Sequence, residues 1–272
     1  MTIAPSDMAR FADLSGARIC FEMAGTGPAL LVINGSGSDM RRRPGLLDSP
    51  LVRSFTVLTY DHRGLGRSTS AADRPTMLDF GRDALELCQH LGWDRYGVLG
   101  LSFGGMVAQE LALAAAATST PDQISRLVLA CTSSGGAGGA SAPLHEIYQL
   151  PLAQRAQRLA VVNDLRCVDD EARRDAVVAF ITSTTADEPL DLGFARQLEA
   201  RRLHDTFDRL PALRVPTLVA AGRHDGIAPL VNAEALTSQI PGAVMQVFEG
   251  GHGFVVEDRA AFRSMGEFLL AD

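Results

Sequence analysis

The residues with the clearest chemical potential lie at 100–105 (GLSFGG), where a strand pattern ends and a helical pattern begins. A serine in this context is typical of a nucleophile elbow, a turn so tight that the residues two before and two after the serine must be small. Gly100 and Gly104 meet this requirement, and Gly105 allows the helix to pack closely on the sheet. The motif predicts that Ser102 is a nucleophile at the carboxyl end of a central strand, where the helix dipole favours developing negative charge.

A nucleophilic serine needs a base, and the base needs a carboxylate that orients it. On a sheet of this kind the partners follow later strands, in the order serine, acid, histidine. Of the six histidines, His252 follows the last predicted strand, and the glycines around it allow that loop to fold back over Ser102. The candidate acid is Asp225, in GRHDG just after the preceding predicted strand. The alternatives are an exposed loop histidine and an aspartate that serves only an Asp-Gly turn.

Acyl transfer also needs backbone N–H groups that stabilise an oxyanion. One is expected from Phe103, directly after the serine, and the other from Ser36, in the loop NGSGS that follows a strand predicted at Ala29–Ile33. A generic glycine-rich turn is the alternative for this loop. A dinucleotide-type phosphate loop is excluded, because Met40 stands where the third glycine of that motif is needed.

Three residues beside these motifs are candidates for lining a substrate pocket, with core packing as the alternative: Gly35, Ile227 and Phe254. Residues 41–43 (RRR) follow the oxyanion loop and offer a clamp for a substrate carboxylate. Charge runs are usually solvated, however, so we expect these arginines in solvent and neutral esters or lactones as substrates. The chain shows no metal-ligand spacing, and we expect no metal and no cofactor.

The elements that position these residues follow from hydrophobic periodicity. Two alternating segments, 9–14 and 18–24, predict an N-terminal hairpin, and apolar runs predict strands at Ala29–Ile33, 55–60, Tyr96–Leu101, 127–131, 217–221 and Val244–Phe248. Helical patterns lie at 77–91, 103–117, 229–240 and 260–270. Strands that alternate with helices predict an α/β fold with a doubly wound, mostly parallel sheet covered on both faces.

One region interrupts this alternation. Between Thr132 and Arg214 only helical patterns are found, near 151–162, 170–182 and 190–204, after a Gly- and Ser-rich entry at 133–142. The pattern predicts a core domain formed by residues 1–132 and 211–272, with residues 133–210 inserted as a helical cap.

Together these motifs resemble the α/β-hydrolase superfamily, in its cap-bearing serine esterase and enol-lactone hydrolase branch. The resemblance covers nearly the whole chain and includes residues 60–68 (YDHRGLGRS), which are similar to a strand-to-loop signature of the family and to which we assign a structural role. Relatives that open epoxides or displace halide use aspartate at the elbow, so Ser102 argues against both reactions. Asn34 stands where many relatives have a histidine before the oxyanion glycine.

The resemblance implies a cofactor-free serine hydrolase that cleaves small to medium carboxylic esters or lactones through an acyl-enzyme on Ser102. Alternatives with the same triad are an enol-lactone hydrolase, a C–C bond hydrolase and a cofactor-free perhydrolase or haloperoxidase. An alternative from another class is a non-catalytic small-molecule receptor on the same fold.

Composition limits the remaining choices. The 272 residues carry a net charge of −7, which argues against nucleic acid as a partner, and the 25 basic residues are all arginine, so no lysine can act as a nucleophile. The four cysteines form no Cys-x-x-Cys pair and predict free thiols in a reducing compartment: Cys20, Cys88, Cys131 and Cys167. Neither a secretory signal nor an apolar stretch of ~20 residues is present, so we expect a cytoplasmic protein that does not engage a membrane.

Overall fold

A single eight-stranded sheet forms the centre of the computed structural model, which describes residues 9–42, 44–118, 121–184 and 191–271. The strand order is β1-β2-β4-β3-β5-β6-β7-β8. The strands are β1 (Arg10–Asp13), β2 (Arg18–Ala24), β3 (Ala29–Ile33), β4 (Thr56–Tyr60), β5 (Tyr96–Leu101), β6 (Ile124–Ala130), β7 (Thr217–Gly222) and β8 (Val244–Phe248). β1–β2 and β2–β4 are antiparallel and the other neighbours are parallel, which confirms the predicted hairpin and mostly parallel sheet.

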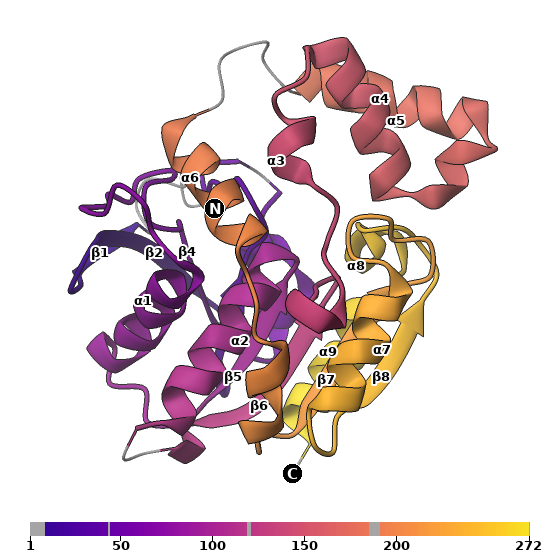
Figure 1. Ribbon diagram of the computed structural model, residues 1–272. Helices are drawn as coiled ribbons and strands as arrows, with labels where there is room; N and C mark the ends of the chain where they lie inside the picture. The colour runs from indigo at the N-terminus through magenta and orange to yellow at the C-terminus, as the bar shows by residue number, and fades with distance from the viewer. Residues whose placement is uncertain (1–8, 43, 119–120, 185–190, 272) are drawn as a thin grey trace.

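Helices cover both faces of this sheet (Figure 1). The described α-helices are α1 (Met77–His90), α2 (Phe103–Ala116), α3 (Leu144–Ile147), α4 (Leu152–Asn163), α5 (Glu171–Thr184), α6 (Leu192–Arg202), α7 (Leu230–Gln239), α8 (Phe254–Glu257) and α9 (Ala261–Leu270). Helices α1, α2 and α7 pack on one face through residues such as Phe80, Leu111 and Leu236. Helix α9 packs on the other face through Met265 and Leu269, so the doubly wound arrangement is confirmed.

The strands contribute side chains to both apolar cores. In β3, Leu31 and Ile33 join the core under α1 and α2, whereas Leu30 and Val32 join the core under α9. Successive side chains of a strand point to opposite faces, so a strand buried on both faces reads as an uninterrupted apolar run. Strand β6 begins at Ile124, earlier than predicted, because Ser125 and Arg126 interrupt the apolar pattern while their backbone still belongs to the strand.

The segment between β6 and β7 contains helices α3 to α6 and, among its described residues, no strand longer than an isolated bridge between Gly135 and Asp205. Figure 1 shows these helices gathered at one end of the sheet. Their side chains Leu144, Ile147, Leu159 and Leu198 form an apolar cluster with Ile227 of the loop after β7. Of the helices in the described part of the chain, none is long and apolar enough to cross a membrane.

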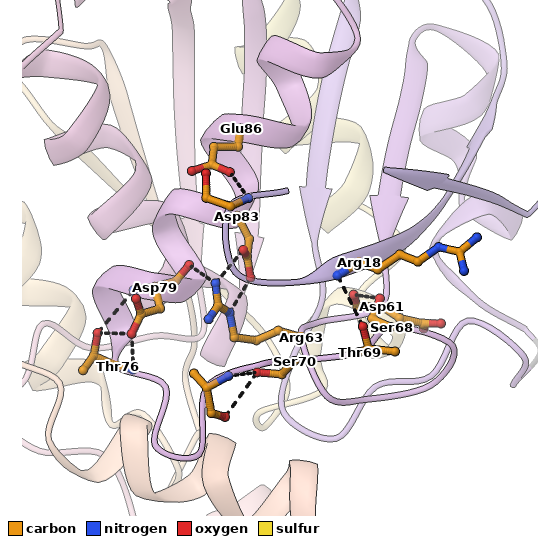
Figure 2. Close-up of polar contacts among 12 residues, drawn as sticks. Arg18, Asp61, Arg63, Ser68, Thr69, Ser70, Thr76, Asp79, Asp83 and Glu86 are labelled. Atoms are coloured by element: carbon orange, nitrogen blue, oxygen red, sulfur yellow. Dashed lines mark hydrogen bonds and ion pairs between the residues drawn. The ribbon is translucent and has the colours of Figure 1, made fainter. Parts of the chain in front are cut away.

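The loop after β4 is held by its own polar side chains (Figure 2). Asp61 accepts the N–H groups of Met40 at 2.8 Å and Arg67 at 2.9 Å, so one carboxylate joins this loop to the segment after β3. The hydroxyl of Ser68 donates to the Asp61 carbonyl at 2.7 Å and accepts the N–H of Cys20 at 2.8 Å. These contacts support the structural role assigned to residues 60–68.

The same loop carries a buried ion pair, visible in the middle of Figure 2. The guanidinium of Arg63 binds both carboxylate oxygens of Asp83 at 2.6 Å, and the two side chains are 5% and 3% exposed.

Arg63→Met is expected to lower the free energy of unfolding by about 3–5 kcal/mol, because it leaves the Asp83 carboxylate buried without a partner. Urea denaturation measures this change. The double variant Arg63→Met/Asp83→Leu should be more stable than the single one; an equal or larger loss would contradict the assignment.

Candidate active site

Ser102 occupies the turn between β5 and α2 with φ 55° and ψ −116°, a left-handed conformation that side chains rarely adopt. Such a conformation is strained and persists only where the surrounding structure imposes it. The N–H of Ser102 donates to the Ala130 carbonyl at 2.9 Å, and its own carbonyl accepts the hydroxyl of Thr132 at 2.8 Å. Both contacts come from the end of β6, so the neighbouring strand holds the serine in place.

The glycines of the motif are required by close backbone approach. A Cβ on Gly100 would collide with the carbonyl of Gly104, and a Cβ on Gly104 would collide with that of Ile33. A Cβ on Gly105 would lie 2.6 Å from the Cβ of Thr132. Helix α2 therefore begins in direct contact with β3 and β6, as a nucleophile elbow requires.

The structure brings Ser102, His252 and Asp225 into one hydrogen-bonded row. His252 Nε2 lies 2.8 Å from Ser102 Oγ, and Nδ1 lies 2.8 Å from Asp225 Oδ2. The second carboxylate oxygen accepts the N–H groups of Ile227 at 2.8 Å and Ala228 at 2.9 Å. An ionised carboxylate only accepts, so the proton belongs on Nδ1 and Nε2 is left to accept the serine hydroxyl.

The end of helix α4 holds the two loops that carry the acid and the histidine. The N–H of His252 donates to the Asn163 carbonyl at 2.6 Å, and the N–H of Gly226 donates to the Val162 carbonyl at 3.0 Å. In return, the N–H of Leu165 donates to the His224 carbonyl at 2.9 Å. The helical insertion therefore touches the candidate site rather than lying apart from it. Its sequence carries no motif that predicts these contacts.

The loop after β3 lies beside the serine. A Cβ on Gly35 would be 3.6 Å from the Cβ of Ser102. The loop is held by Asn34, whose carbonyl accepts His62 Nε2–H at 3.0 Å and whose side chain accepts the Gly35 N–H at 2.9 Å. The two predicted oxyanion donors are the backbone N–H groups of Ser36 and Phe103. Neither N–H group has an acceptor among the described residues. Free N–H groups on either side of a nucleophile suit an oxyanion.

The candidate pocket residues lie in different surroundings. Ile227 is 4% exposed and packs into the apolar cluster of the helical insertion. Phe254 is fully buried and stacks on Phe248, with ring centroids 5.1 Å apart, in the core under α9. A buried core aromatic has no free surface for substrate, so we leave Phe254 out of the proposed site.

The run at 41–43 divides between solvent and loop. Arg41 is 61% exposed and forms an ion pair with Asp39, with Nε 2.9 Å from a carboxylate oxygen. Arg42 lines a cavity of about 150 Å³ beside the loop after β3. Ser102, His252 and Asp225 do not line that cavity. Arg43 lies outside the described residues. Arg41 therefore shows the solvated state expected of a charge run.

His62 belongs to the segment 60–68, to which we assign a structural role, and it supports the loop after β3 through the Asn34 carbonyl. Burial lowers the pKa of His62 to about 4 and that of His204 to about 3. Both rings stay neutral in the folded protein, whereas the unfolded chain binds protons below about pH 6.5. The stability that the two neutral histidines contribute should be fully present above pH 6.5. The free energy of unfolding should then fall as the pH drops from about 6.5 to about 4, by up to about 1.4 kcal/mol per pH unit for each histidine.

Urea denaturation at about pH 7.5 and about pH 4.5 measures this dependence. His62→Phe keeps the ring packing against Tyr60, Phe80 and Phe103 but cannot be protonated, so its unfolding free energy should change less with pH than that of the wild type. Carboxylate contributions cancel in the comparison. Equal pH dependence in the two proteins would show that His62 does not titrate on unfolding.

Comparison with known proteins places the chain in a class. The family model for the alpha/beta hydrolase fold matches residues 28–180, more than half of the chain, and the protein belongs to this family. A poly(3-hydroxyalkanoate) depolymerase of Ectopseudomonas oleovorans is 25% identical over 229 residues, which cover 84% of this chain and 78% of the relative.

Two solved structures are similar over nearly the full length. A hydrolase from Pseudomonas aeruginosa PA01 is 29% identical with a TM-score of 0.76, and the match covers 97% of this chain and 98% of that one. An enol-lactonase from Burkholderia xenovorans LB400 is 25% identical with a TM-score of 0.77 over 96% of this chain and 100% of that one. These relatives support the conclusion that the chain is a hydrolase of the alpha/beta fold.

Proposed function

We propose that this protein is a serine hydrolase that cleaves small to medium carboxylic esters or lactones through an acyl-enzyme on Ser102. The observation that carries the proposal is the row Ser102–His252–Asp225, with both hydrogen bonds at 2.8 Å. A hydroxyl, an imidazole and a buried carboxylate in this order are the parts that nucleophilic acyl transfer requires.

In the proposed first half-reaction, Ser102 Oγ attacks the carbonyl carbon and its proton moves to His252 Nε2. Asp225 is 1% exposed and stabilises the imidazolium that forms. The oxyanion receives the N–H groups of Phe103 and Ser36, and the amino end of α2 adds a favourable dipole. Collapse of the intermediate breaks the C–O bond, and the imidazolium gives its proton to the leaving alkoxide.

In the second half-reaction, His252 takes a proton from water, and the hydroxide attacks the acyl carbon. The C–O bond to Ser102 breaks, and the proton returns to Oγ as the carboxylic acid leaves. A lactone follows the same steps, with the leaving alkoxide still tethered to the acyl group. The similarity to an enol-lactonase supports lactones as substrates, and the similarity to a poly(3-hydroxyalkanoate) depolymerase supports esters as substrates.

We also propose that residues 133–210 act as a cap that determines which substrates fit. The contacts of α4 with the loops of Asp225 and His252, and the position of Ile227 in the cap cluster, support this role. Residues 1–132 and 211–272 then form the catalytic domain.

The proposed function is tested by labelling and turnover together. A fluorophosphonate probe should attach to Ser102, identified by peptide mass analysis, and the label should abolish hydrolysis of p-nitrophenyl esters and of lactones. A panel that also contains β-diketones and a peroxide assay separates the C–C hydrolase and perhydrolase alternatives. Labelling of a different serine, or no turnover of any ester or lactone, would reject the proposal; binding without turnover would favour a receptor.

A further inference from the structure

Helix α6 directs two polar side chains inward, one turn apart. Gln197 is 0% exposed and Arg201 is 5% exposed. Gln197 Oε1 accepts the N–H of Gly37 at 2.7 Å, and Arg201 Nη1 donates to the Ala142 carbonyl at 2.8 Å. The other donors, Gln197 Nε2 and Arg201 Nε and Nη2, have no hydrogen-bond partner in the described part of the chain. Buried polar groups are normally satisfied, so these free donors require an explanation.

Among the described residues, Arg201 also forms no hydrogen bond with a carboxylate: Nη1 donates to a carbonyl, and Nε and Nη2 have no partner. Burial lowers its pKa to about 10, so the guanidinium remains protonated at neutral pH. The acidic group that acts on it is Asp225, but both oxygens of that carboxylate are already occupied by His252, Ile227 and Ala228. A buried charge without a partner is costly, which favours an anion that comes from outside the chain.

Hydrogen bonds link the two side chains to both loops of the candidate site. On one side, Arg201 binds the Ala142 carbonyl, the Ala142 N–H donates to the Ile227 carbonyl at 2.8 Å, and the Ile227 N–H donates to Asp225. On the other side, Gln197 holds Gly37 in the loop whose Gly35 lies beside Ser102. Figure 1 shows α6 at the end of the sheet where α2 begins.

Other cations surround the same place. Arg155 of α4 lies with its guanidinium 5.7 Å from the ring centre of Tyr148, which follows α3. The charges of Arg155, Arg42 and Arg201 all act on the Tyr148 hydroxyl. Arg155 is 6% exposed, and its Nε also lacks a partner among the described residues. Three arginines, two from the cap and one from the loop after β3, therefore gather around Tyr148 although the whole chain carries a net charge of −7.

We propose that Arg201 and Gln197 form a carboxylate-binding subsite of the active site, and that the substrate is an ester or lactone with a free carboxylate. A guanidinium offers paired N–H donors that match a carboxylate, and the Gln197 amide adds a third direction of donation. The proposal rests on the hydrolase function proposed above. An acidic substrate differs from the neutral one expected from the sequence, because Arg201 and Gln197 lie on α6 and not in the run at 41–43.

The test compares two esters that differ at one end. Mono-p-nitrophenyl adipate carries a carboxylate where p-nitrophenyl hexanoate has a methyl group. After subtraction of spontaneous hydrolysis, the wild type should show the higher kcat/KM on the adipate ester. Arg201→Gln should lower the adipate-to-hexanoate ratio of kcat/KM on the order of thirty-fold or more, mainly through KM for the adipate ester. Arg201→Lys, which keeps the charge, should restore part of the ratio.

Arg202→Gln is the matched control. It removes an arginine from the next position of α6, but this side chain is exposed and forms an ion pair with Glu199 at 2.6 Å. The adipate-to-hexanoate ratio should therefore stay at the wild-type value in Arg202→Gln. An equal fall in both variants, or a wild-type preference for hexanoate, would overturn the subsite.

A binding measurement separates the subsite from the chemistry. Calorimetric titration of Ser102→Ala protein with adipamate, which carries a carboxylate, and with hexanamide, which has a methyl group at that end, should show tighter binding of adipamate. Equal Kd values would overturn the subsite, and this result decides if Arg201→Gln does not fold. Turnover by Ser102→Ala would reject the proposed function and leave the binding comparison valid. Loss of turnover in Ser102→Ala together with equal binding of the two amides would reject the subsite alone.

Discussion

Replacing Ser102 with alanine is expected to lower kcat for p-nitrophenyl hexanoate by roughly 10⁴- to 10⁶-fold. The variant removes the oxygen that accepts the acyl group, and His252 then has no proton to take from a nucleophile. The oxyanion donors belong to the backbone and stay in place, so a small residual rate above the uncatalysed reaction should persist. Initial rates with purified protein measure the change, and the fluorophosphonate label should disappear.

Ser133→Ala is the matched control for this prediction. Ser133 lies just beyond the end of β6, is fully buried, and has a hydroxyl without a partner in the described part of the chain. Its loss should change kcat by less than about threefold. Thermal unfolding of both variants should remain cooperative. Ester turnover by Ser102→Ala close to the wild-type rate would mean that another group is the nucleophile.

Replacing Asp225 with asparagine is expected to lower kcat by about 10⁴-fold with little change in fold. The asparagine oxygen can still accept the N–H groups of Ile227 and Ala228, so its NH₂ group faces His252. An NH₂ donor requires Nδ1 as an acceptor, which moves the ring proton to Nε2 and leaves no base for the hydroxyl of Ser102.

The measurement is kcat/KM for one ester together with the rate of fluorophosphonate labelling, and both should fall in parallel. Asp258→Asn is the control, because this aspartate follows α8, six residues after His252, and in the described part of the chain its carboxylate accepts only the N–H of Ala260 at 2.8 Å. Labelling at the wild-type rate in Asp225→Asn would show that another carboxylate orients His252.

Local patterns in the sequence were sufficient for the core of the fold. The elbow around Ser102 is encoded within six residues, because the steric need for glycine on either side of a tight turn acts between near neighbours. Strands buried on both faces appear as apolar runs whatever their order in the sheet. The positions of Asp225 and His252 after later strands follow from the same local signal, since parallel strands present their carboxyl ends at one edge.

Other features of the site depended on the directions in which side chains point in the folded protein. Phe254 is only two residues from His252, yet its side chain turns into the core under α9 because the loop bends at 250–253. Nothing in residues 41–43 tells a solvated arginine such as Arg41 from one beside a cavity such as Arg42.

The helical insertion shows most clearly which features the sequence determined and which the tertiary structure decided. By itself the sequence determined the helical patterns that correspond to α4, α5 and α6, because helical periodicity is local. Only the tertiary structure decided that Gln197 binds Gly37 and that the charge of Asp225 acts on Arg201. Periodicity places these two side chains on one face of α6. The loops that face them are distant in sequence: Gly37 is more than a hundred residues from Gln197, and Asp225 is more than twenty from Arg201. A buried donor without a partner has no sequence signature, because its environment exists only after the chain has packed.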